Sequence, residues 1–214
     1  MIKDKEQKIH QLVSTIKTRI SEINDRYRKG PSLYFYARAF ELRINSTDVE
    51  SFLRNDYHLE ILYATLVSWD MNSRAAKMKY FDDFKSNLFS CLCLLKKIEE
   101  LEEKRDYASI QPVLRDAYRD LNLMESGGKL VSNSKMLHFL FPNLCMPMDG
   151  KNTLEYFFGN TGESESKFLH IIDFSFDVMR LPENWTQYLD NIWNKSIPKM
   201  IDNAILLSVG QSVN

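Results

Sequence analysis

Residues 129–158, KLVSNSKMLHFLFPNLCMPMDGKNTLEYFF, form the most apolar part of the chain that also carries several polar side chains. The stretch predicts a helix that contains Lys135, then a loop bounded by two prolines, then a second helix opened by Asp149. Lys135, His138, Asp149 and Asn152 lie inside or beside this apolar sequence. Because unpaired polar groups are expensive to bury, their presence here predicts a functional site.

The composition favours an all-α protein. Seven glycines and six prolines in 214 residues are few for a turn-rich β architecture, and no segment of useful length alternates apolar and polar residues. The sequence predicts one helical domain, residues 1–214, of about ten helices. Gly127-Gly128 is the clearest flexible joint, so we expect two lobes, residues 1–126 and 127–214, hinged there.

Charge and targeting signals exclude several classes of protein. With 28 basic and 29 acidic residues the net charge is -1, so binding to nucleic acid would require a local basic patch. The sequence has no signal-like apolar core and no apolar run of about 18 residues, which predicts a soluble cytoplasmic protein that does not enter a membrane. Cys91, Cys93 and Cys145 match no zinc spacing and are expected to be buried reduced thiols, so we predict no metal and no cofactor.

Apolar spacing predicts the helices that precede the central stretch. A stripe of apolar residues over 9–27 predicts one long helix stopped by Gly30-Pro31, and an aromatic-rich helix follows over 32–44. Thr47 and Glu50 have the spacing of a capping box. A nearly apolar helix is expected over 58–69.

The remaining helices are predicted from caps and apolar spacing. Asn72 or Ser73 is expected to cap a helix that buries Met78 and Phe81, and Ser109 to start another. An aromatic helix is predicted to span Trp185 to Trp193. Two further helices are expected over 164–181 and over 197–209.

The segment WDMNSRAAKM, residues 69–78, predicts a first candidate binding site. Arg74 and Lys77 would lie in the first turns of a helix, just after Asn72. A helix N-terminus with free N–H groups and nearby cations attracts phosphate. The alternative interpretation is an ordinary capped helix whose cations form salt bridges.

Lys135 and Asp149 form a second candidate site, with His138 three residues after Lys135 and Lys151 and Asn152 just after Asp149. A lysine surrounded by apolar side chains can have its pKa lowered enough to act as a nucleophile, and a carboxylate can orient it or accept a proton. The alternative is structural: Ser134 or Asn133 caps one helix, Asp149 caps the next, and Lys135 pairs with Asp149.

Two motifs resemble known proteins. The pattern S-K-x-L-H-F-x-x-P-x-L-x-P-x-D, residues 134–149, and the upstream block over residues 62–77 are similar to families of uncharacterised bacterial and archaeal helical proteins. A more distant resemblance is to the helix–hairpin–helix DNA glycosylases, which carry a catalytic lysine after a glycine hairpin and then an essential aspartate. The resemblance implies that Lys135 and Asp149 take those two roles and that the fold has two lobes. The segment over residues 130–134 lacks the two hairpin glycines.

Three functions are consistent with these patterns. The leading hypothesis is an uncharacterised nucleic-acid-associated protein that binds through a local basic cleft, with Arg74, Lys77, Lys135 and Lys151 facing it. The second is a DNA glycosylase or lyase relative, with Lys135 as nucleophile and Asp149 as its acid–base partner. The third is a helical module that binds a protein partner.

Overall fold

The computed structural model describes residues 2–27, 30–71 and 77–209, and within them the chain is all-α, as predicted. The described chain contains twelve α-helices, one π-helical turn and one short 3₁₀ helix, joined by loops. The β pairing there is a single antiparallel bridge between Met78 and Met124. The number of helices exceeds the predicted ten in part because the predicted long helix over 9–27 is interrupted.

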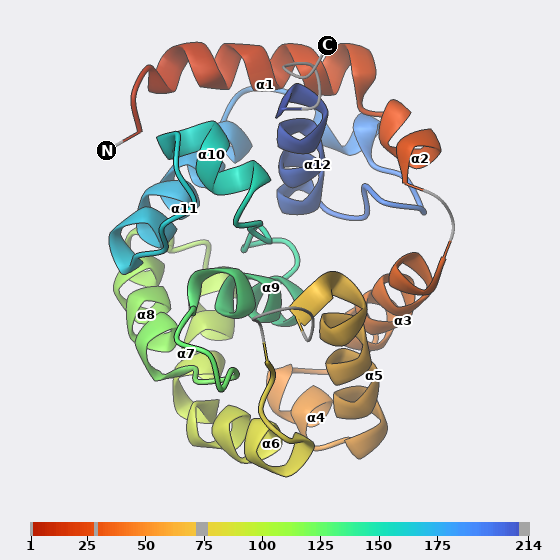
Figure 1. The fold of residues 1–214 in the computed structure, drawn as a ribbon, viewed down its shortest axis with the longest axis vertical. Helices are drawn as coiled ribbons and strands as arrows, with labels where there is room; N and C mark the ends of the chain where they lie inside the picture. Colours follow the sequence, from red (N-terminus) through yellow and green to blue (C-terminus); the bar gives the residue numbers. More distant parts are fainter. Residues whose placement is uncertain (1, 28–29, 72–76, 210–214) are drawn as a thin grey trace.

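The helices form two groups, which Figure 1 shows as the upper and lower halves of the molecule. In the upper group α1 packs along α12, while α10 and α11 also contact α12. We call this group the terminal half because it contains both ends of the chain. Its elements are α1 (Lys5–Arg19), α2 (Glu22–Arg26), α10 (Asn152–Phe158), α11 (Glu165–Met179), η2 (Trp185–Tyr188) and α12 (Ile197–Val209).

The lower group, which we call the central half, runs without interruption from α3 to α9. In it α3 packs on α5, α7 packs on α8, and α9 contacts α3, α5 and α8. Its elements are α3 (Pro31–Ile44), α4 (Val49–Leu53), α5 (Asp56–Leu66), η1 (Val67–Met71), α6 (Phe81–Ser90), α7 (Leu92–Glu103), α8 (Tyr107–Asp120) and α9 (Leu130–Leu140).

The packing pairs helices across the predicted lobe boundary. The predicted division at Gly127-Gly128 assigns α1 and α12 to different lobes, whereas these two helices lie against each other. Gly128 itself is in a tight position, because a Cβ atom there would meet Glu163 Oε2 at 3.2 Å. The Glu163 carboxylate accepts a hydrogen bond of 2.7 Å from the Leu130 amide and so covers the N-terminus of α9. A hinge at Gly127-Gly128 stays a prediction.

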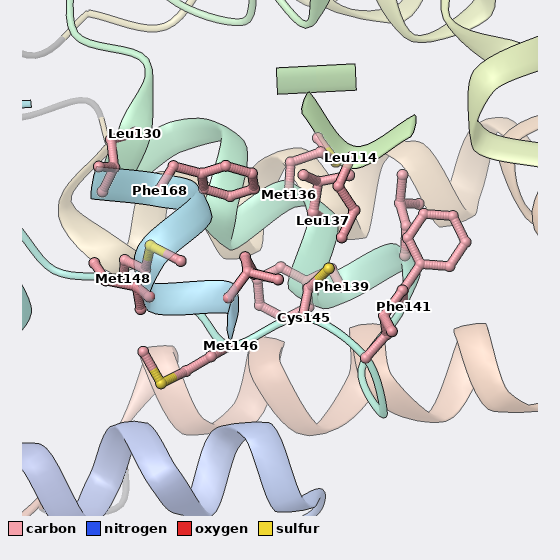
Figure 2. Packing of buried hydrophobic residues seen from close by; sticks show 14 of the residues in the cluster. Leu114, Leu130, Met136, Leu137, Phe139, Phe141, Cys145, Met146, Met148 and Phe168 are labelled. Carbon is pink, nitrogen blue, oxygen red and sulfur yellow. The ribbon is translucent and has the colours of Figure 1, made fainter. Parts of the chain in front are cut away.

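The core continues from α9 of the central half into the loop that leads to α10. Figure 2 shows Met136, Phe139 and Cys145 in the same buried cluster as Phe168 of α11. The last five residues of α9, Met136 to Leu140, are all buried, and Phe141 follows in the core. The most apolar part of the sequence therefore forms the layer between the two halves, which fixes the position of α9 and of the loop after it.

Several helix boundaries differ from the sequence predictions. The predicted long helix over 9–27 is divided at Ile20 and Ser21 into α1 and α2, although Ile20 and Ile23 stay buried on both sides of the break. Asn72 and Ser73 lie outside the described residues. Residues 77–80 are not helical, because they pair with residues 123–125: the backbone amide of Glu125 donates to the Lys77 carbonyl. Helix α6 therefore begins only at Phe81.

The residues that cap the helices also differ from those predicted. The capping box of α4 uses Asp48 and Ser51 instead of Thr47 and Glu50, because Asp48 has the extended backbone of an N-cap. Asp106, not Ser109, caps α8, and its carboxylate accepts from the Ser109 amide.

Two further predictions were wrong. The aromatic helix predicted from Trp185 to Trp193 is a single 3₁₀ turn followed by a loop. Cys91 and Cys145 are buried as predicted, whereas Cys93 is exposed, because residues two apart on a helix point in different directions. No helix of the described ranges has the length and apolar character that crossing a membrane requires.

Candidate functional site: a pocket between the two halves

A pocket of about 380 Å³ lies between the terminal and central halves. Its volume is within the usual range for small-molecule sites. Side chains from four separate regions line it: the α2–α3 segment, η1, the α9–α10 segment, and α12 with the loop before it. The lining residues are Tyr27, Ser32, Ser68, Trp69, Lys135, Pro147, Met148, Asp149, Asn152, Trp193, Lys199, Asp202, Asn203 and Leu206.

The π-helical turn η1 (Val67–Met71) places Trp69 against Lys135. Short π-helical segments occur frequently at functional sites, because the extra residue changes the direction of the backbone groups. Here the ammonium of Lys135 donates a 2.7 Å hydrogen bond to the Trp69 carbonyl and lies 5.8 Å from the centre of its indole ring. Lys135 is the sixth residue of α9 and is partly buried, so this helix holds its side chain at the pocket wall.

Asp149 lines the same pocket from the loop between α9 and α10. Its Oδ1 accepts a 2.6 Å hydrogen bond from the Asn152 amide and a 3.0 Å bond from the Asn152 side chain. The Asp149 amide donates to the Thr153 hydroxyl. Asp149 therefore caps the start of α10, as one of the two sequence interpretations predicted, and this role fixes the carboxylate next to Asn152. The structure thus brings Lys135, Asp149 and Asn152 to one pocket.

α12 contributes a buried polar group that the sequence analysis did not identify. Lys199 donates to Asp202 Oδ2 at 2.6 Å and to Asn203 Oδ1 at 2.9 Å. Its ammonium also lies 5.1 Å from the centre of the Trp69 ring and 5.8 Å from that of Trp193. All three polar residues are at least 95% buried. The available signal was the spacing K-x-x-D-N in the apolar helix over 197–209, which also fits an ordinary i,i+3 salt bridge.

The charges that line the pocket are balanced. Two lysines, Lys135 and Lys199, face two aspartates, Asp149 and Asp202. Burial raises the pKa of Asp202, the ammonium of Lys199 lowers it in part, and Asp149 raises it further. Asp149 and Asp202 therefore interact electrostatically, and among the described residues the pocket lining has no excess of positive charge.

His138 lies behind the pocket and not in its lining. The imidazole is fully buried, and its Nδ1 is 2.8 Å from the Cys145 carbonyl. Burial lowers the pKa of His138 to about 3, while the Cys145 carbonyl opposes this shift. The ring stacks on Tyr36, which in turn stacks on Trp193. His138 is therefore neutral at physiological pH and supports the aromatic wall from within the core.

The other predicted binding residues either do not line the pocket or lie outside the described chain. Lys77 is exposed and forms a 2.6 Å ion pair with Glu125, which raises the pKa of the lysine. Lys151 is exposed at the start of α10, two residues after Asp149, and does not line the pocket. Asn72 and Arg74 lie outside the described residues. Lys77 does not lie in the first turns of a helix as predicted, because residues 77–80 are not helical and α6 begins at Phe81. The anion site itself stays a prediction.

Comparisons with protein-family models, with curated proteins and with solved structures found no match to this chain. The resemblance to uncharacterised helical families and to glycosylases therefore stays a prediction. Within residues 2–27, 30–71 and 77–209, no three His, Cys, Asp or Glu side chains gather in a way that would hold a metal ion.

Proposed function

We propose that the protein binds nucleic acid locally, by accepting a single unpaired nucleobase into the pocket between its two halves. The observation that carries the proposal is that two indoles, Trp69 and Trp193, and the polar groups of nine other side chains line one pocket of about 380 Å³. Base–aromatic stacking contributes about 1–3 kcal/mol per base, whereas the hydrogen bonds of the polar groups fix the orientation of the ring.

Two exposed cations adjacent to pocket-lining residues support the same proposal. Lys151 is exposed beside Asp149, and the exposed Arg26 donates to the carbonyl of Leu206, which lines the pocket. Two such groups suit the phosphates on either side of one inserted nucleotide. With few phosphate contacts, the slope of log K against log salt for a single strand should be only about -1.5.

A cytoplasmic location belongs to the same proposal. Cys91, Cys93 and Cys145 all lie in the described chain, and all three are free thiols. Free thiols are typical of reducing compartments.

Titration of tryptophan emission with short single-stranded DNA and RNA tests the proposed function, with a blunt duplex for comparison. We expect single strands to change the emission at micromolar protein and the duplex to bind more weakly, because its bases are stacked and paired. Lys135→Met should weaken binding, because it removes a charge at the pocket wall. Lys97→Met, a substitution of an exposed lysine on α7, is the matched control and should leave binding unchanged. If no single strand binds, a protein-binding helical module becomes the better account.

A second function, that of a DNA glycosylase or lyase, is favoured by one specific observation: Lys135 and Asp149 open on the same pocket. In a lyase the lysine amine condenses with the sugar aldehyde of an abasic site, and water is lost as an imine forms. Borohydride reduces that imine to a stable cross-link. Trapping with abasic DNA, followed by peptide mapping, would identify Lys135 or Lys199 as the nucleophile. Absence of a cross-link in the presence of binding would leave the binding function alone.

A further inference from the structure

We propose that Lys199 and Asp202 of α12 are the recognition pair of the pocket, and that they select a ligand edge on which a hydrogen-bond donor stands beside an acceptor. The proposal rests on the proposed function, because it specifies which part of a nucleobase the pocket contacts. It adds two specificity-determining residues and a chemical definition of the ligand.

The geometry of the pair leaves one donor and one acceptor for a ligand. An ammonium has three N–H donors, and Lys199 uses two of them on Asp202 and Asn203. The carboxylate of Asp202 accepts from Lys199 through Oδ2, and among the described residues its Oδ1 accepts no hydrogen bond. Both side chains are buried, with 6% and 8% of their surface exposed, and both line the pocket.

Comparison with the other well-buried ion pair of the described chain shows why a purely structural role does not account for Lys199 and Asp202. Arg43 and Glu99 join separate elements, because Arg43 also donates to the Leu140 carbonyl and Glu99 accepts from the Val49 amide. Lys199 and Asp202 are three residues apart on one helix, so their bond connects no two elements. A buried ion pair of this kind stabilises a fold little, or less than apolar residues of the same size would.

Asn203 explains how the pair is held in place. Its side-chain amide donates to the Trp193 carbonyl and to Asn194 Oδ1, while its Oδ1 accepts from Lys199. The same residue therefore fixes the loop that carries Trp193 and the ammonium of Lys199. A flat ring that enters the pocket beside Trp69 would lie within reach of the recognition pair, because the ammonium of Lys199 is 5.1 Å from the centre of that indole ring.

An amide-type edge of a nucleobase matches the pair. A ring N–H donates to the carboxylate of Asp202, and the adjacent carbonyl oxygen accepts from the ammonium of Lys199. Methylation of that ring nitrogen removes the donor, adds bulk at the contact and leaves the carboxylate unsatisfied. Uridine with 3-methyluridine, and inosine with 1-methylinosine, are therefore matched test pairs. The nucleosides and short oligonucleotides that carry the same bases distinguish a free ligand from a nucleic acid strand.

The experiment measures affinities for these ligands by tryptophan fluorescence, first with the wild-type protein. We expect methylation to weaken binding at least about tenfold in whichever ligand form binds. In the double variant Lys199→Met/Asp202→Leu, the methylated and unmethylated ligands should bind equally. That variant replaces a buried ion pair with apolar side chains of similar size, so its melting temperature should not fall.

The outcomes separate this inference from the proposed function. If the wild-type protein binds neither nucleosides nor oligonucleotides, the proposed function fails and the recognition pair fails with it. If the wild-type protein binds them but tolerates methylation, only the recognition pair is refuted, and this comparison needs no variant. A double variant that keeps the preference for unmethylated ligands, or one whose only change is a lower melting temperature, would likewise assign Lys199 and Asp202 a structural role.

Discussion

His138 should make the protein measurably less stable in mild acid. The imidazole is fully buried, and the Cys145 carbonyl can only accept, so Nδ1 carries the proton of the neutral ring. Nε2 is also buried and has no hydrogen-bond partner among the described residues. A second proton on this ring would therefore place an uncompensated charge in the core between the two halves.

The size of the effect follows from the pKa of His138, which burial lowers from 6.5 to about 3 in the folded protein. In the unfolded chain the ring binds a proton below its ordinary pKa of about 6.5. The unfolded state thus binds more protons, and stability is lost as the pH falls below 6.5 and continues to be lost down to about 3. Between pH 7 and pH 5 this linkage removes about 2 kcal/mol from the free energy of unfolding.

Urea denaturation between pH 7 and pH 5 measures this effect if a variant without the titrating ring is compared. His138→Asn keeps an N–H group near the position of Nδ1 for the Cys145 carbonyl and removes the imidazole. The variant should be less stable at pH 7 because of the lost packing, and the difference from the wild-type protein should shrink by about 2 kcal/mol at pH 5. His10→Asn, at an exposed position of α1, is the control and should leave the pH dependence unchanged. If the free energies of unfolding of the wild-type protein and of His138→Asn changed by the same amount between pH 7 and pH 5, the reasoning would be refuted.

Three further predictions concern the free energy of unfolding. Asp149→Ala should lower it by about 1 kcal/mol, because the cap on the Asn152 amide is lost, and thermal denaturation would show an unchanged midpoint if the cap contributed nothing. Glu99→Ala should cost about 3 kcal/mol by leaving a buried arginine unpaired, whereas Glu100→Ala removes only a surface pair and should cost less than about 1 kcal/mol in the same urea assay. Burial raises the pKa of Glu102 to about 7, so ionisation of this carboxyl destabilises the fold above pH 4.5, increasingly up to pH 7. Glu102→Gln should therefore raise the free energy of unfolding by at most about 3 kcal/mol at pH 8, and this gain should vanish near pH 4.5. A gain that does not depend on pH would contradict this.

Apolar spacing predicted the fold class because it depends only on local sequence. The helix over 32–44 and the helix that Asp149 opens both appear in the structure close to their predicted bounds. Boundaries failed where tertiary contacts decide the backbone. Residues 77–80 are extended because they pair with residues 123–125, and this contact is not visible in the spacing of Met78 and Phe81.

The pocket was predicted only in part, for a related reason. Lys135 and Asp149 were identified because each interrupts an apolar stretch in a way that a helix face does not explain. Lys199 and Asp202 are three residues apart on an apolar helix, and their burial depends on α12 lying against the rest of the terminal half. His138 was predicted to bind ligand because a polar residue in an apolar helix predicts burial but not which side of the buried layer it faces.

The balance of charge in the pocket changes what kind of recognition the protein can achieve. The leading sequence hypothesis required a local patch of cations, yet the described pocket lining holds two aspartates, Asp149 and Asp202, beside its two lysines. The whole chain carries a net charge of -1. Long-range attraction to phosphate is therefore weak, and affinity has to come from stacking on the indoles and from hydrogen bonds to the ligand edge. Such contacts are insensitive to salt, whereas binding to a basic surface weakens steeply with it. A shallow salt dependence combined with strong sensitivity to methylation of the base would thus favour the pocket, and the reverse pattern would favour a phosphate-binding surface elsewhere on the molecule.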